Sequence, residues 1–245
     1  MTTPTISVVI PAWNEEKSVG RAIDSLRRAI AHYERERGAT AEIIVVDNNS
    51  SDQTSAVARE HGATVVFEPV NNIGKARNAG VRVASGKFIA FCDADNQVTE
   101  NLLTLIHDHL SDPKTAGGGT WIQPERHSLK IDFFYFVWGI YVRCSRVGVG
   151  MMHCRKEDFE AIGGFDETIF AAEDVQLAYD LRKLGKPRGQ QFNLIRKGWI
   201  ITSTRKIDQL PLHVMIGKII GFGFGLQKKI RNKKYCEHWY GKAAR

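Results

Sequence analysis

Two carboxylates stand one residue apart where an apolar segment ends. The stretch FIAFC, residues 88–92, is followed by Asp93, Ala94 and Asp95. In an extended segment alternate residues face the same way, so both acids would point to one side. Mg²⁺ or Mn²⁺ is commonly held by one or two carboxylates together with phosphate oxygens of a substrate. The pattern predicts either such a metal–phosphate site or a plain turn, with Thr99 capping the next helix.

A second acidic pair opens a helical pattern later in the chain. Glu173 and Asp174 begin the sequence EDVQLAYDLRKLG, and the flexible pair Gly163-Gly164 precedes them. Acids are favoured at a helix N-terminus by the helix dipole, which is one interpretation. The other is that a carboxylate beside a bound substrate acts as a general base.

Three further polar residues lie near strand ends or helix starts. Asp47 could bind a ribose hydroxyl or a base N–H, or it could cap the following helix together with Ser50 or Ser51. Lys75 and Arg77, in GKARNAG, could hold phosphate or a base carbonyl, or could form a solvated helix face. The chain has no GxGxxG and no GxxxxGK[ST], so a nucleotide site would be of another design.

Four strand–helix units position these residues. The predicted strands cover residues 5–10, 41–46, 63–68 and 87–92, and each precedes an amphipathic helical pattern. Apolar strands that alternate with helices indicate an α/β fold with a parallel sheet, whose ligands bind at the carboxyl ends of the strands. The ends at 11–15, 47–50 and 93–95 should therefore meet at one rim.

The pattern changes after about residue 115. A glycine-rich strand at 115–122, an aromatic segment to 142, an apolar stretch at 147–154 and a helix at 173–185 follow. From about Lys206 the chain is basic and apolar. We expect a first half at 1–115, a second half of the same domain at 116–205, and a C-terminal segment at 206–245.

Composition narrows the function classes. The 245 residues are 43% hydrophobic and 25% charged, which is typical of one folded globule. Four dispersed cysteines indicate neither a zinc site nor a disulfide framework, and the N-terminal residues lack a signal pattern, so a cytoplasmic protein is expected. The longest uncharged apolar run, 133–142, is too short to span a membrane. The net charge of +7 fits anionic lipid or phosphorylated ligands; nucleic acid is not expected as a partner.

Six motifs, in order over about residues 5–205, resemble the family 2 glycosyltransferases of the GT-A fold. They are VVIPAWNEE, VVDNNSSDQT, GKARNAG, FIAFCDAD, CRKEDFEAIGGFDE and AAEDVQLAYDLRKLG. The resemblance implies a three-layer α/β sandwich with a mostly parallel central sheet and a C-terminal helical appendage. It also implies a nucleoside-diphosphate-sugar donor, with UDP expected, bound Mn²⁺ or Mg²⁺, and an inverting displacement by an acceptor hydroxyl. The first half would then bind the nucleotide sugar and the second half the acceptor.

The resemblance also assigns roles by matching motif. Asp174 would be the catalytic base, with Glu173 beside it and Gly163-Gly164 near the sugar. Asp95 would hold the metal, and Asp93 the metal or the ribose. The remaining nucleotide contacts would be Ala12, Trp13 and Glu15 at the nucleoside, Asp47 at the base, and Lys75 and Arg77 at the base or diphosphate.

Some positions depart from the family pattern or stay open. Trp13 stands where the family more often has Tyr, and the Q-x-x-R-W signature of processive members is absent, so transfer of a single sugar is expected. Arg205 or Lys206 could contact the diphosphate or lie on a surface strand. His153 and His213 are candidates for a third metal ligand, with a structural role as the alternative.

The C-terminal segment suggests a membrane surface. Residues 212–240 combine apolar residues, five basic residues between Lys228 and Lys234, and an aromatic end. They could attach the protein to the inner face of an anionic membrane and favour a lipid-linked acceptor, or form a docking helix. The 133–142 segment could line a lipid path or lie in the core.

Two other functions remain open. One is that of a non-catalytic nucleotide-sugar-binding relative. The other is a sugar-phosphate nucleotidyltransferase, which should have a glycine-rich basic loop where this chain has PAWNEE.

Overall fold

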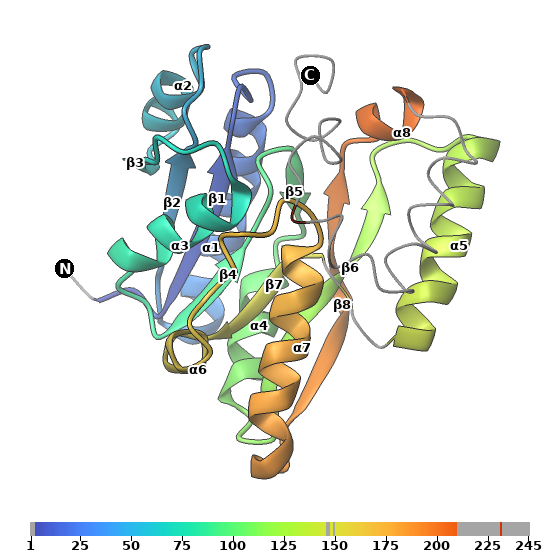
Figure 1. Cartoon of the computed structure of the whole chain (residues 1–245). Coiled ribbons are helices and arrows are strands. Elements are labelled where there is room, and N and C mark those ends of the chain that lie inside the picture. Colours follow the sequence, from blue (N-terminus) through green and yellow to red (C-terminus); the bar gives the residue numbers. More distant parts are fainter. Residues whose placement is uncertain (1–2, 146–147, 149, 210–230, 232–245) are drawn as a thin grey trace.

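The computed structural model describes residues 3–145, 148, 150–209 and 231 (Figure 1). Its first half is a parallel β-α arrangement. The strands β1 (Ile6–Ala12), β2 (Ala41–Asp47), β3 (Thr64–Phe67) and β4 (Phe88–Phe91) lie in the order β3-β2-β1-β4, all parallel. All four predicted strands are confirmed to within one or two residues.

The second half continues the same sheet instead of starting another. The eight strands run β3-β2-β1-β4-β7-β6-β8-β5. Here β7 (Met152–Arg155) is antiparallel to β4 and β6, whereas β6 (Thr115–Pro124) and the long β8 (Gln191–Thr202) are parallel. The short β5 (Asn96–Val98) closes the edge, antiparallel to β8. β5 was not expected, because three residues are too few to show a periodic pattern.

Helices cover both faces of the sheet in three layers. On one face α1 (Val19–Arg37) and α4 (Leu102–Ser111) pack against Val8 and Ile10 of β1. On the other face α3 (Ile73–Val83), α6 (Lys156–Ala161) and α7 (Glu173–Gly185) pack against Val9 of the same strand. Side chains that alternate along β1 thus point into the two hydrophobic cores on opposite faces of the sheet. This arrangement confirms the expected three-layer sandwich.

The remaining elements lie near the ends of the sheet. They are α2 (Thr54–Glu60), α5 (Leu129–Ser145), a short 3₁₀ turn η1 (Lys186–Arg188) and α8 (Arg205–Gln209). In Figure 1, α5 stands at the opposite side of the molecule from β3. Among the helices that the structure describes, none is long and apolar enough to cross a membrane. Apart from α8 and Arg231, the predicted C-terminal segment lies outside the described residues.

Candidate functional site

The loops after β1 and β2 hold each other at the rim. The Asn14 amide N–H donates to Ser50 Oγ at 2.9 Å, and the Ser51 amide N–H donates to Asn14 Oδ1 at 2.8 Å. Asn14 and Asn49 have φ of 51° and 66°, a left-handed conformation that Asn tolerates better than most residues. This double loop carries Trp13, and Ala12 ends the strand that leads into it.

Asp47 holds that double loop through both of its carboxylate oxygens. Its Oδ1 accepts from the Ser50 amide at 2.9 Å, and its Oδ2 accepts from Ser55 Oγ at 2.5 Å. The side chain is almost wholly buried. Asp47 therefore does not cap α2, because the Thr54 amide at the start of that helix donates to Asp52 Oδ1 instead. A contact of Asp47 with a base stays a prediction.

Arg77 joins the two acidic pairs. Its Nη2 donates to Asp93 Oδ1 at 2.9 Å and its Nη1 donates to Glu173 Oε1 at 2.7 Å, while its guanidinium lies 5.2 Å from the centre of the Phe165 ring. Burial lowers the pKa of Arg77, but Glu173 and Asp93 together raise this pKa above its ordinary value. Arg77 is thus buried between the halves, and the solvated helix face considered from the sequence is wrong for this residue.

Asp174 lies next to this ion-pair cluster. Its Oδ1 accepts from the Val175 amide at 2.7 Å. Burial and the neighbouring Glu173 carboxylate raise the pKa of Asp174 to about 7, although Arg77 works in the opposite direction. A carboxylate that titrates near neutral pH can accept a proton from a hydroxyl under physiological conditions.

The turn into α7 is strained just before these acids. Ala172 has φ of 60°, and its side chain does not cap the helix. For a residue with a Cβ the left-handed conformation costs roughly 1–2 kcal/mol. Strain of this kind concentrates at functional sites, where surrounding contacts hold it in place.

Asp93 and Asp95 lie in a turn, so the extended geometry expected for them is wrong. The Asp93 carbonyl accepts from the Asn96 amide at 3.1 Å, and Ala94 and Asp95 form the turn. The cause is the turn-forming composition of DADN. Thr99 does not cap α4 with its side chain, since Thr99 Oγ1 accepts from the Trp199 amide at 3.3 Å instead.

Arg205 reaches the same rim from α8. Its Nη2 donates to Glu15 Oε1 and Oε2 at 3.3 and 3.2 Å, and it lies 4.0 Å from Asp95 Oδ2. The Arg205 Nε atom is buried and has no hydrogen-bond partner among the residues that the structure describes. Arg205 is therefore at the acidic rim and not on a surface strand. Nothing is described of the Lys206 side chain.

The acids at this rim fit a hard divalent cation. The Asp93 carboxylate is half exposed, and Asp95 follows two residues later. Both side chains offer only oxygen atoms as metal ligands, which is what hard divalent cations prefer. The described part of the chain holds no group of three or more His, Cys, Asp or Glu able to enclose a metal. Within the described residues the donor set therefore suits binding by two carboxylates plus ligand oxygens.

His153 does not supply such a third ligand. It lies on β7, where its Nε2 is 2.9 Å from His109 Nδ1 and its Nδ1 is 3.0 Å from the Met151 carbonyl. Burial and His109 lower the pKa of His153 to about 3, so it is a neutral core residue. His213 lies outside the described residues.

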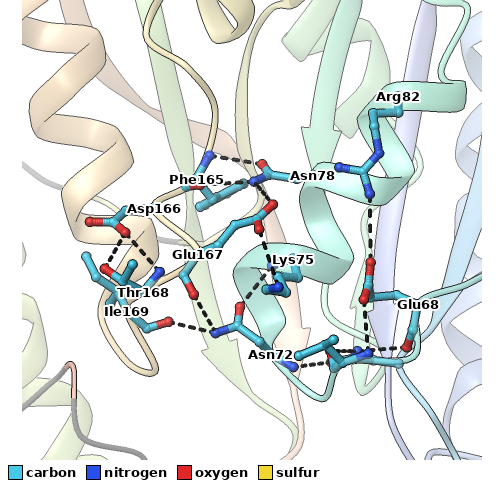
Figure 2. Close-up of polar contacts among 12 residues, drawn as sticks. Glu68, Asn72, Lys75, Asn78, Arg82, Phe165, Asp166, Glu167, Thr168 and Ile169 are labelled. Atoms are coloured by element: carbon cyan, nitrogen blue, oxygen red, sulfur yellow. Dashed lines mark hydrogen bonds and ion pairs between the residues drawn. The ribbon is translucent and has the colours of Figure 1, made fainter.

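A polar network fastens the loop that leads to α7 onto α3 (Figure 2). Asn72 caps α3 by accepting from the Lys75 amide at 2.9 Å, and its Nδ2 donates to the carbonyls of Glu167 and Ile169. Asn78 Nδ2 donates to Glu167 Oε1 at 3.0 Å, and Lys75 Nζ lies 3.7 Å from Glu167 Oε2. Lys75 thus pairs with Glu167, while its predicted contact with a nucleotide stays a prediction. Only the Asn N-cap signal before α3 could have been found in the sequence.

Gly163 and Gly164 terminate α6. The Gly164 amide donates to the Phe159 carbonyl and the Gly163 amide to the Glu160 carbonyl, both at 3.0 Å, which is a Schellman motif. Their φ values of 80° and 74° explain the glycines locally. Proximity of this pair to a sugar stays a prediction.

An aromatic pocket of about 280 Å³ lies between β6 and α5. Trp121, Tyr135 and Trp138 line it, together with aliphatic and a few polar side chains. Burial and the charge of Asp95 raise the pKa of Tyr135, which places this phenol within electrostatic reach of the acidic rim. β6 and α5 are consecutive in the chain, but sequence reasoning did not identify the pocket, because no sequence pattern specifies how α5 folds back beside β6.

Comparisons with known proteins agree with this architecture. The chain is 37% identical over 98 residues to an uncharacterized glycosyltransferase of Mycobacterium tuberculosis, covering 40% of each protein. Among solved structures, TarS of S. aureus superposes with a TM-score of 0.61 at 15% identity, covering 91% of this chain and 73% of TarS. The mannosyltransferase PcManGT of Pyrobaculum calidifontis gives a TM-score of 0.65 at 19% identity, covering 90% of this chain and 65% of PcManGT. At these identities the two structures show the fold.

The family of the protein is shown by a match to a protein-family model. The matched part spans only about two fifths of the mycobacterial relative, so that relative alone does not establish the family. The model of glycosyl transferase family 2, however, matches residues 7–138, which is more than half of the chain. The protein therefore belongs to glycosyl transferase family 2.

Proposed function

We propose that the protein transfers one sugar from a nucleoside-diphosphate sugar to an acceptor hydroxyl, with inversion and with help from a divalent cation. The observation that carries this proposal is the Arg77 guanidinium, which contacts both Asp93 and Glu173. It brings the acidic pair at the end of β4 and the acidic pair at the start of α7 to one place. Donor activation and proton removal need groups of these two kinds side by side.

The donor nucleotide is assigned to the rim formed by β1, β2 and α3. Trp13 offers an aromatic surface to a base, and Ala12 and Glu15 flank it. Asp47, Lys75 and Arg77 complete the proposed nucleotide contacts. UDP is the proposed nucleotide, supported by TarS complexes with UDP and UDP-GlcNAc, and GDP is its main competitor because PcManGT was solved with GDP-Man and Mn²⁺.

Asp174 is the proposed catalytic base. Its carboxylate takes the proton of the acceptor hydroxyl as that oxygen attacks the anomeric carbon. The attack comes from the side opposite the departing diphosphate, so one displacement inverts the anomeric configuration. Glu173 is held in place by Arg77, and its negative charge helps to raise the pKa of the Asp174 carboxyl to about 7.

Asp95 and Asp93 are the proposed metal ligands. Mn²⁺ or Mg²⁺ held there would neutralise negative charge on the leaving diphosphate as a Lewis acid. Arg205, with its Nη2 4.0 Å from Asp95, is the proposed second contact of the diphosphate. Its guanidinium can donate to phosphate oxygens in the fork geometry that suits them.

A lipid-linked acceptor and attachment to an anionic membrane through residues 212–240 complete the proposal. The aromatic pocket near Tyr135 supports the lipid-linked acceptor, because it offers apolar volume within electrostatic reach of Asp95.

Two alternative functions predict other results. A non-catalytic relative would bind the donor and transfer nothing. A nucleotidyltransferase is disfavoured, because the loop after β1 forms a double loop with Ser50 and Ser51 and is neither glycine-rich nor basic.

A panel of nucleoside diphosphates tests the donor site. Thermal unfolding of the wild type is measured with each diphosphate, with and without Mn²⁺, because a ligand specific for the folded state raises Tm. One diphosphate should stabilise the protein only with Mn²⁺, and Asp95→Ala should lose that gain. Asp24→Ala, on α1 where Asp24 pairs with His61, is the matched control and should keep the gain. If no diphosphate raises Tm, the proposed donor site is wrong.

A further inference from the structure

Residues 165–169 lead from α6 towards α7, and we call them the α7 loop (Figure 2). Asn72, at the start of α3, holds this loop by its backbone. Its Nδ2 donates to the Glu167 carbonyl and to the Ile169 carbonyl, both at 3.2 Å, while its Oδ1 accepts from the Lys75 amide. Asn72 is only 1% exposed, so water cannot readily replace these bonds. Because a buried carbonyl without a partner is unfavourable, the asparagine fixes where the loop lies.

Asn78, later in α3, holds the start of the same loop. Its Nδ2 donates to the Phe165 carbonyl and its Oδ1 accepts from the Phe165 amide, both at 3.0 Å. The same Nδ2 donates to Glu167 Oε1 at 3.0 Å. Together with the bonds of Asn72, these contacts satisfy four backbone groups of the α7 loop. We call Asn72 and Asn78 the asparagine clamp.

The turn between the α7 loop and α7 is strained and has no side-chain cap. Ala172, the residue before the helix, has φ of 60°. A residue with a Cβ stays in this conformation only where the surrounding structure holds it. The asparagine clamp fixes the chain before the turn, and Arg77 Nη1 holds Glu173 after it at 2.7 Å. Clamp and arginine both belong to α3 or its N-cap, so one helix fixes the chain on both sides of Asp174.

Other contacts of the α7 loop are less directional. Phe165 and Ile169 are almost wholly buried, so apolar packing also anchors the loop. Such packing is non-directional, whereas hydrogen bonds of a planar amide fix both distance and orientation. Arg231 donates to Asp166 Oδ2 at 2.8 Å, but this arginine is half exposed, and exposed ion pairs contribute little. The asparagine clamp therefore sets the orientation of the loop.

We infer that Asn72 and Asn78 are positioning residues, which hold the α7 loop so that the Asp174 carboxylate is placed to take the acceptor's proton. The inference rests on the proposed function, in which Asp174 is the base. Placement matters because a displacement of about 1 Å can cost roughly 100-fold in rate. In this role neither asparagine touches the donor or the acceptor. Release of the clamp should therefore slow the reaction without weakening donor binding.

Asn72→Ser tests the inference, because serine still caps α3 but cannot donate to both loop carbonyls. Cleavage of a panel of UDP and GDP sugars by the full chain is measured with Mn²⁺, with water in place of the acceptor. The kcat of Asn72→Ser should fall about tenfold or more, while KM for the donor stays within about twofold of the wild-type value. The rise in Tm with the matching diphosphate and Mn²⁺ should also be kept, which shows that the variant folds.

Asn101→Ser is the matched control. Asn101 precedes α4, and its Nδ2 donates to the Lys197 carbonyl at 3.1 Å. The control thus loses the same kind of bond at the start of another helix. Its kcat should change by less than about twofold.

Hydrogen exchange followed by mass spectrometry gives a readout that needs no donor. The amides of residues 165–175 should exchange about tenfold faster or more in Asn72→Ser than in the wild type, because the loop opens locally. The amides of α1 should exchange at the wild-type rate. A local rise separates release of the loop from a general loss of stability.

Each outcome decides the matter. The inference is overturned if exchange of residues 165–175 is unchanged, if it rises as much in α1, or if kcat keeps its wild-type value although the loop exchanges faster. It is also overturned if KM for the donor rises as much as kcat falls, because Asn72 would then belong to the donor site. If Asn72→Ser does not fold, Asn78→Ser leaves the cap of α3 intact and is judged by the same outcomes. A wild type that cleaves no donor refutes the proposed function and the inference with it, and wild-type cleavage is measured first so that this failure is recognised separately.

Discussion

Replacing Asp174 by Asn should stabilise the protein while removing its proposed base, and the gain should grow with pH. The ordinary carboxyl pKa is 3.8, and burial with Glu173 raises it to about 7 in the folded protein. Below pH 3.8 the carboxyl is neutral in both states and costs nothing. Between pH 3.8 and pH 7 the carboxyl is ionised in the unfolded state but still protonated in the folded state. The free energy of unfolding therefore falls by about 1.4 kcal/mol for each unit that the pH rises.

The size of the effect follows from that shift. About three pKa units correspond to about 4 kcal/mol at pH 8, which is an upper bound because the side chain is only partly buried. We expect Asp174→Asn to be more stable than the wild type by about 2 kcal/mol at pH 8 and by less than about 1 kcal/mol at pH 5. Asn keeps the size and neutrality of the protonated acid, so packing is nearly unchanged.

Urea unfolding in the presence of a metal chelator measures this difference. Wild type and Asp174→Asn are compared at pH 5 and pH 8, with Asp180→Asn on the same helix as the matched control. The control should shift by less than about 0.5 kcal/mol at either pH. Equal stability differences at the two pH values would show that Asp174 is not a carboxyl whose ionisation opposes folding.

Three other substitutions test separate contacts. Arg77→Met should destabilise the protein by about 3–5 kcal/mol in urea unfolding, because two carboxylates lose their buried partner; a loss below about 1 kcal/mol would contradict the ion-pair cluster. His153 has a pKa lowered to about 3, so Tm should fall as the pH drops below 6.5, and His153→Gln should reduce that slope; an unchanged slope would show that His153 does not cause it. Gly164→Ala should cost more stability than Gly163→Ala, because its added Cβ would lie 2.8 Å from Asn78 Oδ1 whereas Gly163 faces open space; equal costs would refute the packing argument.

The parallel half of the fold was predictable because its signals are local. Each strand of β1 to β4 is a short, largely apolar run followed by residues at helical spacing, and α7 begins at Glu173 as the sequence indicated. The continuation through β7, β6 and β8 was not predictable in order or direction, because strand pairing depends on contacts between distant segments. The three-residue β5 gives no periodic signal at all.

The candidate site was predictable in its residues and less so in their partners. Asp93, Asp95, Glu173 and Asp174 were identified by type and spacing. The role of Arg77 as their common partner depends on residues 16 and 96 positions away, which no local pattern specifies. Arg77 forms these ion pairs, whereas the sequence predicted a contact with phosphate or a base carbonyl, or else a solvated helix face.

The polar residues at the strand ends could not be assigned to structure or to ligand binding from the sequence. Asp47 accepts from Ser50 and Ser55, and DADN forms a turn, which was one of the two interpretations that its composition allowed. Asn, Asp and Ser side chains satisfy nearby backbone groups, so at a strand end the same residues serve structure and ligand contact alike. Their presence alone does not separate the two uses.

The most direct test of the central claim is donor cleavage by the wild type and by Asp174→Asn. Release of nucleoside diphosphate from the matching nucleotide sugar is followed with Mn²⁺, with water in place of the acceptor. The wild type should release it, and Asp174→Asn should be slower by about 100-fold or more, while the nucleotide-dependent rise in Tm stays unchanged. If Asp174→Asn cleaves the donor as fast as the wild type, Asp174 is not the base and the proposed mechanism is wrong.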